Sequence, residues 1–596
     1  MRVEGYAAIR DYAAIGDGRT LALVALDGSI DWLCLPAIDS SGVCAGVLDT
    51  AQGGRFGLAP AVPFTVKRRY VPDSNVLEST FVTEGGIVRV TDAMLLPGAG
   101  LTPVREIARR VQGLAGSVPM GWRVEPRFGF GSARTLLGWR GGVPVATSGR
   151  DALAVCAWGA GEPTMDAVSI SGEMSVAEGA SALLVVSVAH KEPLVLPSRK
   201  EVEGRLQATL GFWRDWVAGR SYNGPWREAV VRSALALKLL HYSPSGAIAA
   251  AGTTSLPEEI GGERNWDYRF CWIRDSAFTL DALMRLGCPG EAESFFWWLL
   301  HASQLTKPRL QVLYRLDGGA QAPERELDLE GYRGSRPVRV GNGAAHQEQL
   351  DIYGDLMQTA WLYAQAGGRI DRETGRRLAG MADHVCRIWS APDSGIWEVR
   401  GEPQHFTHSK MMCWVALDRA VHLADIGRLP QKGMARWRHE ADLIHDFVER
   451  RCWSGHLKSY VRSADSTELD ASLLLGALMG FPSAIDRSMS QTIDAIRLEL
   501  GHGVLLYRYS GDDGVSGGEG AFLCCSFWLV EALALAGRLQ EAAEMMAELI
   551  TLANDVGLYA EEIDIESREL LGNFPQGLVH LALINAATSI AAAERR

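Results

Sequence analysis

The feature that most constrains the fold of this 596-residue chain is a series of apolar helical runs that each end at a glycine and restart within a few residues. A glycine that ends a helix in the left-handed conformation, followed directly by a new helix, is typical of an αα-hairpin. The spacing of these glycines is uneven, so it indicates a structural period without a sequence repeat. The five turn glycines are Gly287, Gly367, Gly427, Gly480 and Gly537.

Five hairpins predict ten helices, and apolar runs at 225–241 and 575–592 add two more. Pairing the first helix with the last would close a ring of six pairs, so we predict an (α/α)6 barrel over residues 223–596. In such a ring the short turns gather at one end and the long connections at the other. Function is expected among the long connections. They cover residues 243–273, 304–349, 390–407, 451–467, 499–521 and 556–574.

The first 198 residues have a different pattern, in which short alternating apolar and polar segments are broken by turn dipeptides. Asp27-Gly28, Gly85-Gly86 and Gly141-Gly142 are hairpin signals, because such pairs tolerate positive φ where a strand reverses. We therefore predict an N-terminal β-sandwich over residues 1–198. A helical linker over 199–222 would join it to the barrel, giving a mainly α protein with an all-β N-terminal domain.

Composition excludes several classes of partner. The formal net charge of -12 argues against a nucleic-acid partner, since phosphate neutralisation needs a surplus of Lys and Arg. No apolar run is long enough for a membrane span, and the first residues lack a signal-peptide pattern, so we expect a cytoplasmic protein without a membrane partner. The ten cysteines include no CxxC pair, which indicates neither a disulfide framework nor a thiolate metal site. A homo-oligomer is left open.

Aromatic and charged residues crowd several of the long connections, above all in the stretch "NWDYRFCWIRDS" at 265–276. Ring faces stack on the C–H surfaces of sugars, while carboxylates and guanidinium groups bind hydroxyls. The pattern favours a pocket for a neutral carbohydrate. The alternative is that these rings only pack the beginning of a helix.

Two carboxylates from different connections would supply the chemistry of glycoside hydrolysis, one as general acid and one as general base. By position the candidates are Glu398 and Glu561, with Glu562 as an alternative to the latter. The chain has 71 acidic residues, so position alone also fits solvated loop charges.

Other motifs do not support a metal or cofactor site. His405 and His408 are spaced like ligands, but no third ligand follows at a recognised spacing. Asp512 and Asp513 lack the ordered alternation and closing Glu of a calcium loop, which favours turn formation. We expect no metal and no cofactor.

Several stretches, in order along nearly the whole chain, resemble bacterial members of glycoside hydrolase family 15, which contains glucoamylases, glucodextranases and trehalases. They include "IGDGRTLALVALDGSIDWLCLP", "TTSLPEEIGGERNWDYRFCWIRDS", "HFTHSKMMCWVALDRA" and "LLGNFPQGLVHLALINAA". The resemblance implies an N-terminal β-sandwich, an (α/α)6 barrel, and hydrolysis of terminal α-glucosidic bonds with inversion and without a metal.

The resemblance also implies roles for individual residues. It puts the general acid on Glu398, after Trp397 of the substrate site, and the base on Glu561. Arg274 and Asp275 match the pair that holds the hydroxyls of the terminal glucose. Tyr268 and Trp272 match the contacts near the cleaved bond and the sugar face, and Arg508 matches the arginine of the fifth connection.

One departure bears on the substrate. Where many relatives read "LPRFDSP" this chain reads "LPAIDSSG", so Ala37 and Ile38 replace an arginine and an aromatic residue. If this loop reaches the barrel mouth, Ala37 removes a charged contact on the leaving-group side.

Our first hypothesis is an inverting, exo-acting hydrolase of a small α-glucoside, with trehalose first and α-1,4 or α-1,6 gluco-oligosaccharides next. The alternative is a toroidal sugar- or glycoside-binding or biosynthetic protein of the same fold that acts on a glycosylated small molecule. Retention of both Glu398 and Glu561 favours catalysis, because a binding protein needs no paired acid and base.

Overall fold

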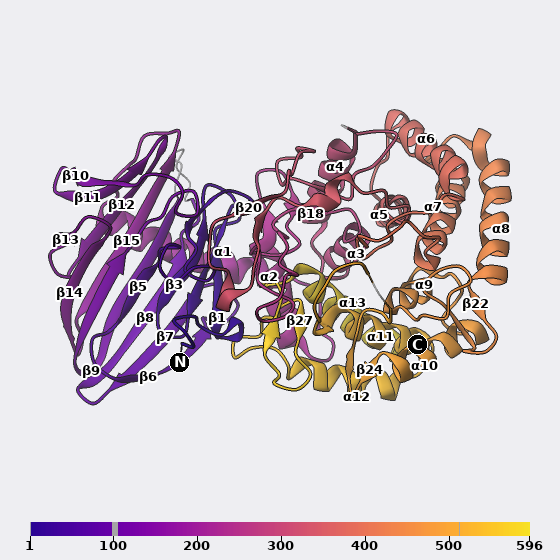
Figure 1. The fold of residues 1–596 in the computed structure, drawn as a ribbon. Coiled ribbons are helices and arrows are strands. Elements are labelled where there is room, and N and C mark those ends of the chain that lie inside the picture. The colour runs from indigo at the N-terminus through magenta and orange to yellow at the C-terminus, as the bar shows by residue number, and fades with distance from the viewer. Residues whose placement is uncertain (1, 98–104, 305, 512, 596) are drawn as a thin grey trace.

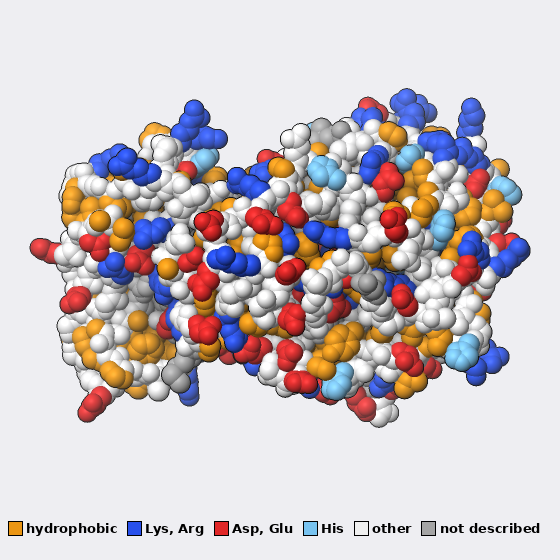
Figure 2. Space-filling model, viewed as in Figure 1, with side chains coloured by type: hydrophobic (Ala, Val, Ile, Leu, Met, Phe, Trp, Pro, Cys, Tyr) orange, Lys and Arg blue, Asp and Glu red, His pale blue; other side chains and the backbone are white. Residues whose placement is uncertain are grey.

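The structure, a computed structural model, describes residues 2–97, 105–304, 306–511 and 513–595. An all-β domain comes first and a helical domain follows it, side by side along the long axis of the molecule (Figure 1). Acidic and basic side chains are interspersed over the visible face of both domains (Figure 2).

The β-domain is built from strands that lie within residues 12–190. Their bounds are β1 (Tyr12–Gly16), β2 (Leu21–Ala25), β3 (Ser29–Cys34), β4 (Gly42–Cys44), β5 (Phe56–Pro60), β6 (Phe64–Tyr70), β7 (Leu77–Thr83), β8 (Gly86–Met94), β9 (Glu106–Val124), β10 (Leu136–Arg140), β11 (Val143–Ser148), β12 (Asp151–Trp158), β13 (Thr164–Met165), β14 (Ile170–Ala177) and β15 (Ser181–His190).

The predicted hairpin turns are confirmed. Gly28 lies between β2 and β3 with φ of 83°, and Gly86 opens β8 opposite Thr83 of β7. Between β10 and β11, Gly141 and Gly142 have φ of 58° and 80°. Positive φ at both central residues is the geometry that reverses a chain in two residues.

The two layers of the domain share strand β9. Its first part pairs with β8 and β15, and its second part pairs with β5 and β14, so the hydrogen-bonded ladder is continuous through all strands of this sheet. Side chains cross between the layers: the Tyr70 hydroxyl of β6 donates to the carbonyl of Ala14 in β1 at 2.7 Å. Arg109 of β9, which pairs with Asp92, donates to the carbonyls of Gly28 and Phe56.

The helical part begins with α1 (Arg199–Ala218), which Ser198 and Glu201 start as a capping box. We propose to keep the predicted domain limits, 1–198, 199–222 and 223–596, because α1 stands between the last strand of the sheet and the ring of helices. The helices of that ring are α2 (Arg227–Leu240), α3 (Ser276–Arg285), α4 (Pro289–Gln304), α5 (Ile352–Gln365), α6 (Arg372–Ile388), α7 (Thr407–Asp425), α8 (Met434–Arg451), α9 (Leu474–Met479), α10 (Arg487–Glu499), α11 (Leu523–Leu535), α12 (Leu539–Ile550) and α13 (Gly577–Ala593).

These twelve helices form two concentric rings. The inner helices α3, α5, α7, α9, α11 and α13 each pack against the next, and α13 packs against α3. Along the chain, each of the outer helices α4, α6, α8, α10 and α12 comes directly after an inner helix. The remaining outer helix, α2, packs on α13, so the first helix pairs with the last as predicted. All five turn glycines have positive φ, between 73° and 88°. The predicted (α/α)6 barrel is confirmed, and so are the left-handed glycines that end its helices at the hairpin turns.

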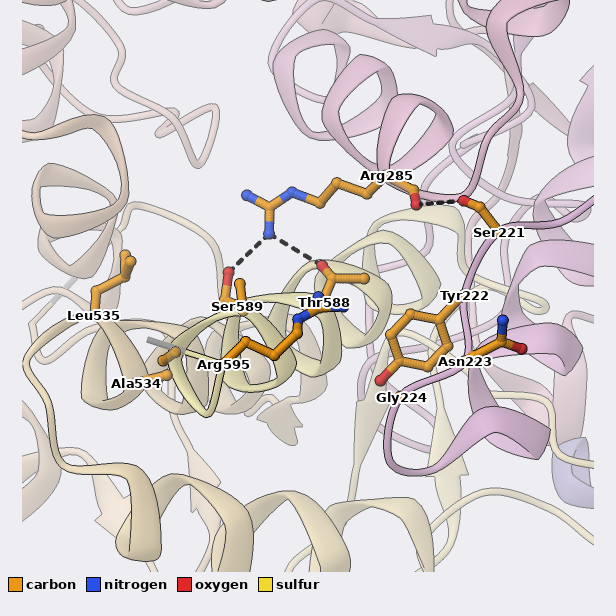
Figure 3. A pocket seen from close by; sticks show the side chains of 12 residues that line it. Ser221, Tyr222, Asn223, Gly224, Arg285, Ala534, Leu535, Thr588, Ser589 and Arg595 are labelled. Carbon is orange, nitrogen blue, oxygen red and sulfur yellow. Dashed lines mark hydrogen bonds between the residues drawn. The ribbon is translucent and has the colours of Figure 1, made fainter.

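Polar contacts close the ring at the end where the hairpin turns lie (Figure 3). Arg285 of α3 donates to the hydroxyls of Thr588 and Ser589 of α13 at 3.0 and 2.8 Å. Ser221, from the segment after α1, donates to the carbonyl of Arg285. A cavity of about 620 Å³ lies here, at the end opposite to the long connections.

Candidate active site

A second cavity, of about 390 Å³, lies among the long connections of the barrel. Four connections line it: the first, second, third and fifth. The sixth, which carries Glu561, contributes no residue to this lining. The principal lining side chains are Glu258, Arg264, Trp266, Tyr268, Trp272, Glu324, Asn342, Gln347, Trp397, Glu398, Arg400, Arg508 and Asp513.

Glu398 faces this cavity from the third connection. Its Oε1 accepts a hydrogen bond from the Trp272 indole at 3.0 Å, and the Arg274 guanidinium lies 3.4 Å from the same atom. Its backbone is in the left-handed region, with φ of 53°, and its carbonyl accepts from the Gln347 amide. A non-glycine residue is held there only when surrounding contacts fix it, which is common at functional sites.

Burial raises the pKa of Glu398, and the positive charge of Arg274 and the indole hydrogen bond of Trp272 partly oppose this. The net shift is upward, so the neutral form is favoured relative to an ordinary glutamate. Arg274 is itself held by Asp275, whose Oδ1 accepts from Nε at 2.8 Å. Asp275 precedes the inner helix α3, and neither Arg274 nor Asp275 is among the residues that line the cavity.

Glu561 and Glu562 lie at the start of a small sheet formed by β26 (Ala521–Phe522), β27 (Glu562–Ile563) and β28 (Leu570–Leu571). Neighbouring residues of a strand face opposite sides, so the two carboxylates have different surroundings. Glu562 accepts from the backbone N–H of Gly520 at 2.7 Å. Glu561 is 2% exposed, and burial together with the charge of Glu258 raises its pKa to about 8, against the opposing effect of Arg508.

Tyr268 shows that the two candidate carboxylates share one region. Burial raises the pKa of its phenol, and the negative charges of Glu561, Glu258 and Glu398 raise it further. Tyr268 lines the cavity and packs edge-to-face on Trp272, with ring centroids 5.2 Å apart. The charges of Glu398 and Glu561 therefore act on the same side chain, although Glu561 is not among the residues that line the cavity.

Comparison with known proteins identifies the family. A sequence model described as "Glycosyl hydrolases family 15" matches residues 224–588, and one described as "Trehalase-like, N-terminal" matches residues 4–167. The chain belongs to glycosyl hydrolases family 15.

Relatives extend the match over the whole chain. A protein named trehalase from Thermoplasma volcanium is 36% identical over 594 residues, which cover 99% of this chain and 94% of the relative. A trehalase from Mycobacterium tuberculosis is 38% identical, and the matched region covers 98% of this chain and 90% of the relative. A bacterial glucoamylase complexed with acarbose has the same fold, with a TM-score of 0.72 at 13% identity, over 99% of this chain and 96% of that one. The chain is an O-glycoside hydrolase, and we do not retain the alternative of a binding protein.

The remaining aromatic residue predicted for this family 15 site, Trp397, is fixed by other side chains. Its indole N–H donates to Asp470 at 2.9 Å, and its ring packs against Phe522 and Trp528. Tyr268, Trp272 and Trp397 all line the cavity, so the rings of the first connection do more than pack a helix start.

Arg508 lines the cavity within an ionic cluster that sequence reasoning missed. Its Nη2 lies 2.9 Å from Glu258 and 3.8 Å from Glu562, and its Nε donates to Glu519 at 3.1 Å. Arg264 stands beside the cluster and pairs with Asp513 at 2.7 Å. The available signal was the position of Glu258 and Arg264 in the first long connection, next to the aromatic stretch.

The residues weighed as metal ligands have other surroundings. His408 is buried with Nδ1 3.8 Å from Asp351, whereas His405 packs on Phe447. Asp513 is held by Arg264, and Asp512 lies outside the described residues. Within the described ranges, one group of three candidate ligands comes together, Glu258, Glu519 and Glu562, and the Arg508 guanidinium contacts all three.

The loop with Ala37 and Ile38 is not part of the cavity lining. It lies against the first connection, where Arg269 donates to the carbonyls of Ile38 and Ser40 and pairs with Asp267 at 2.7 Å. Ala37 itself is buried. In the described part of the chain, no helix has the length and apolar character needed to span a bilayer.

Proposed function

We propose that this family 15 enzyme hydrolyses a small α-glucoside, with trehalose as the first substrate and α-1,4 or α-1,6 gluco-oligosaccharides next, and that it inverts the anomeric configuration. The observation that carries the proposal is that Glu398 lines one cavity with Tyr268 and Trp272, while the buried Glu561 lies close enough for its charge to act on Tyr268. The cavity volume of about 390 Å³ is near the lower end of ligand pockets, which suits a disaccharide better than a polymer. The names of the relatives support trehalose.

In the proposed mechanism Glu398 is the general acid. It gives its proton to the glycosidic oxygen as the bond from that oxygen to the anomeric carbon breaks. Its raised pKa supplies the proton, and the Trp272 hydrogen bond to Oε1 leaves Oε2 as the atom that transfers it.

Glu561 is the general base. It takes a proton from the water whose oxygen forms the new bond on the opposite face of the sugar, so one displacement inverts the centre. Because burial and Glu258 raise its pKa, we expect the ionised form that acts as base to require a higher pH than an ordinary glutamate does.

The other predicted residues hold the substrate. Arg274 and Asp275, at the start of α3, bind the hydroxyls of the terminal glucose, and Arg274 also fixes the acid. Tyr268 and Trp272 flank the cleaved bond, Trp397 forms the adjoining aromatic wall, and Arg508 completes the site on the side of the fifth connection.

A panel of α-linked disaccharides, followed by NMR during the first turnovers, tests the proposal. Inverting hydrolysis of trehalose would release one β-glucose and one α-glucose per molecule, because only the attacked anomeric carbon changes configuration. Release of α-glucose alone would refute inversion. Failure to cleave any member of the panel would refute the substrate class.

A further inference from the structure

The cavity contains a third buried carboxylate, Glu258, to which the proposed mechanism gives no role. Glu258 is 2% exposed and lines the cavity from the first long connection. Arg508 holds its Oε2 at 2.9 Å, and Arg264 lies 3.9 Å from the same atom. Its other oxygen, Oε1, is buried and has no hydrogen-bond partner among the described residues.

Neither of two other acidic residues of the lining, Asp513 and Glu324, has a buried side-chain oxygen without a hydrogen-bond partner. Asp513 accepts from Arg264, from the Tyr509 hydroxyl and from the backbone N–H of Val515. Glu324 accepts from the backbone N–H of Gly343 at 3.0 Å and pairs with Arg400. An unpaired buried acceptor is costly, so Glu258 is a group that a bound hydroxyl would stabilise.

The position of Glu258 fits the sugar beyond the cleaved bond. Arg274 and Asp275, the residues matched to the terminal glucose, are not among the residues that line the cavity, whereas the exposed residues Arg400 and Gly401 line it at its opening. An exo-acting enzyme holds the terminal glucose at the closed end, so the leaving-group sugar must occupy the part nearer the opening. Contacts connect Glu258 to that part: Arg264, 3.9 Å from Glu258, pairs with Asp513, whose carbonyl accepts from the backbone N–H of Arg400.

We propose that Glu258 is a specificity-determining residue for the leaving-group sugar: Oε1 accepts a hydrogen bond from a hydroxyl of the second hexose, while Arg508 fixes the carboxylate through Oε2. The inference rests on the proposed function. A cation is a poorer occupant, because the Arg508 guanidinium already lies among the oxygens of Glu258, Glu519 and Glu562.

The test compares a disaccharide with α-glucosyl fluoride, which has the same glucose but no leaving-group sugar. Both substrates need Glu561 and water, and only the disaccharide contacts Glu258. We expect Glu258→Ala to lower kcat/KM for trehalose by about 10- to 100-fold, the loss typical of a hydrogen bond to a charged group, and to change the value for the fluoride by less than about threefold.

Both values are taken from the plateau of full pH profiles, because loss of the Glu258 charge also shifts the ionisation of Glu561. Glu519→Gln is the matched control, since it removes a charge from the same Arg508 cluster at a residue outside the cavity lining. It should affect the two substrates equally. If the alanine variant unfolds, Glu258→Gln replaces it in the comparison. The thermal unfolding midpoint is measured for all variants.

Equal losses on both substrates, or no loss on trehalose, would overturn the role of Glu258 and leave the proposed hydrolase intact. If another disaccharide of the panel is the one cleaved, the same comparison applies to it. Wild-type enzyme that cleaves no disaccharide would overturn the proposed function itself, together with this inference.

Discussion

The placement of Glu561 by its neighbour Gly572 gives the sharpest prediction. Gly572 has φ of 72°, and a Cβ added there would lie 2.7 Å from both Cβ and Oε2 of Glu561. Because carbon atoms pack at about 3.5 Å or more, Gly572→Ala must displace the Glu561 side chain by at least about half an ångström. A misplacement of about 1 Å at a reacting group can lower the rate by about 100-fold, so we expect kcat to fall by about 10- to 100-fold.

The same substitution also places alanine in the left-handed region, which costs roughly 1–2 kcal/mol of stability. Gly427→Ala is the matched control for this loss of stability. Gly427 has φ of 73°, no atom within 4 Å of an added Cβ, and lies at a hairpin turn at the other end of the barrel. Both variants should lose similar free energy of unfolding, measured by denaturant titration, and only Gly572→Ala should lose activity.

Steady-state kinetics on trehalose, with the free energy of unfolding measured for both proteins, decides the point. If Gly572→Ala retains kcat within about threefold of wild type, Glu561 is not the group whose position controls the reaction. If Gly427→Ala loses as much activity as Gly572→Ala, the effect comes from backbone strain and not from the base.

The other predictions concern the two carboxylates and the acid's hydrogen bond. Glu398→Gln should lower trehalose hydrolysis by about 10²- to 10⁴-fold but retain most activity on α-glucosyl fluoride, whose leaving group needs no proton. Glu561→Gln should lose both activities, and an unchanged fluoride rate in that variant would contradict its role as base. Trp272→Phe removes a hydrogen bond that lowers the pKa of Glu398, so the pKa of Glu398 in the kcat/KM profile should move to higher pH. A pH profile in which neither inflection moves to higher pH would show that the indole does not control the acid.

For much of the site, the sequence predicted which long connection carries each residue but not which side chains contact one another. Glu398, Tyr268 and Trp272 were predicted to meet at one end of the barrel, and the structure brings them together. The resemblance placed Arg508 in the substrate site, but the partners that hold it were not predictable. The sequence left open whether the loop with Ala37 reaches the barrel mouth, and the structure shows the loop packed on Arg269 outside the cavity lining.

The sequence by itself determined the features whose causes lie within a few residues. The five helix-ending glycines and the Gly141-Gly142 turn adopt positive φ because the chain reverses at those residues and a side chain there would be strained. Only the tertiary structure decided the charge state of the site. Glu258, Arg508 and Glu562 come from three connections separated by more than fifty residues along the chain, and they meet where water is excluded. The pKa of Glu561 depends on that desolvation and on those charges, and neither is encoded in the residues next to it.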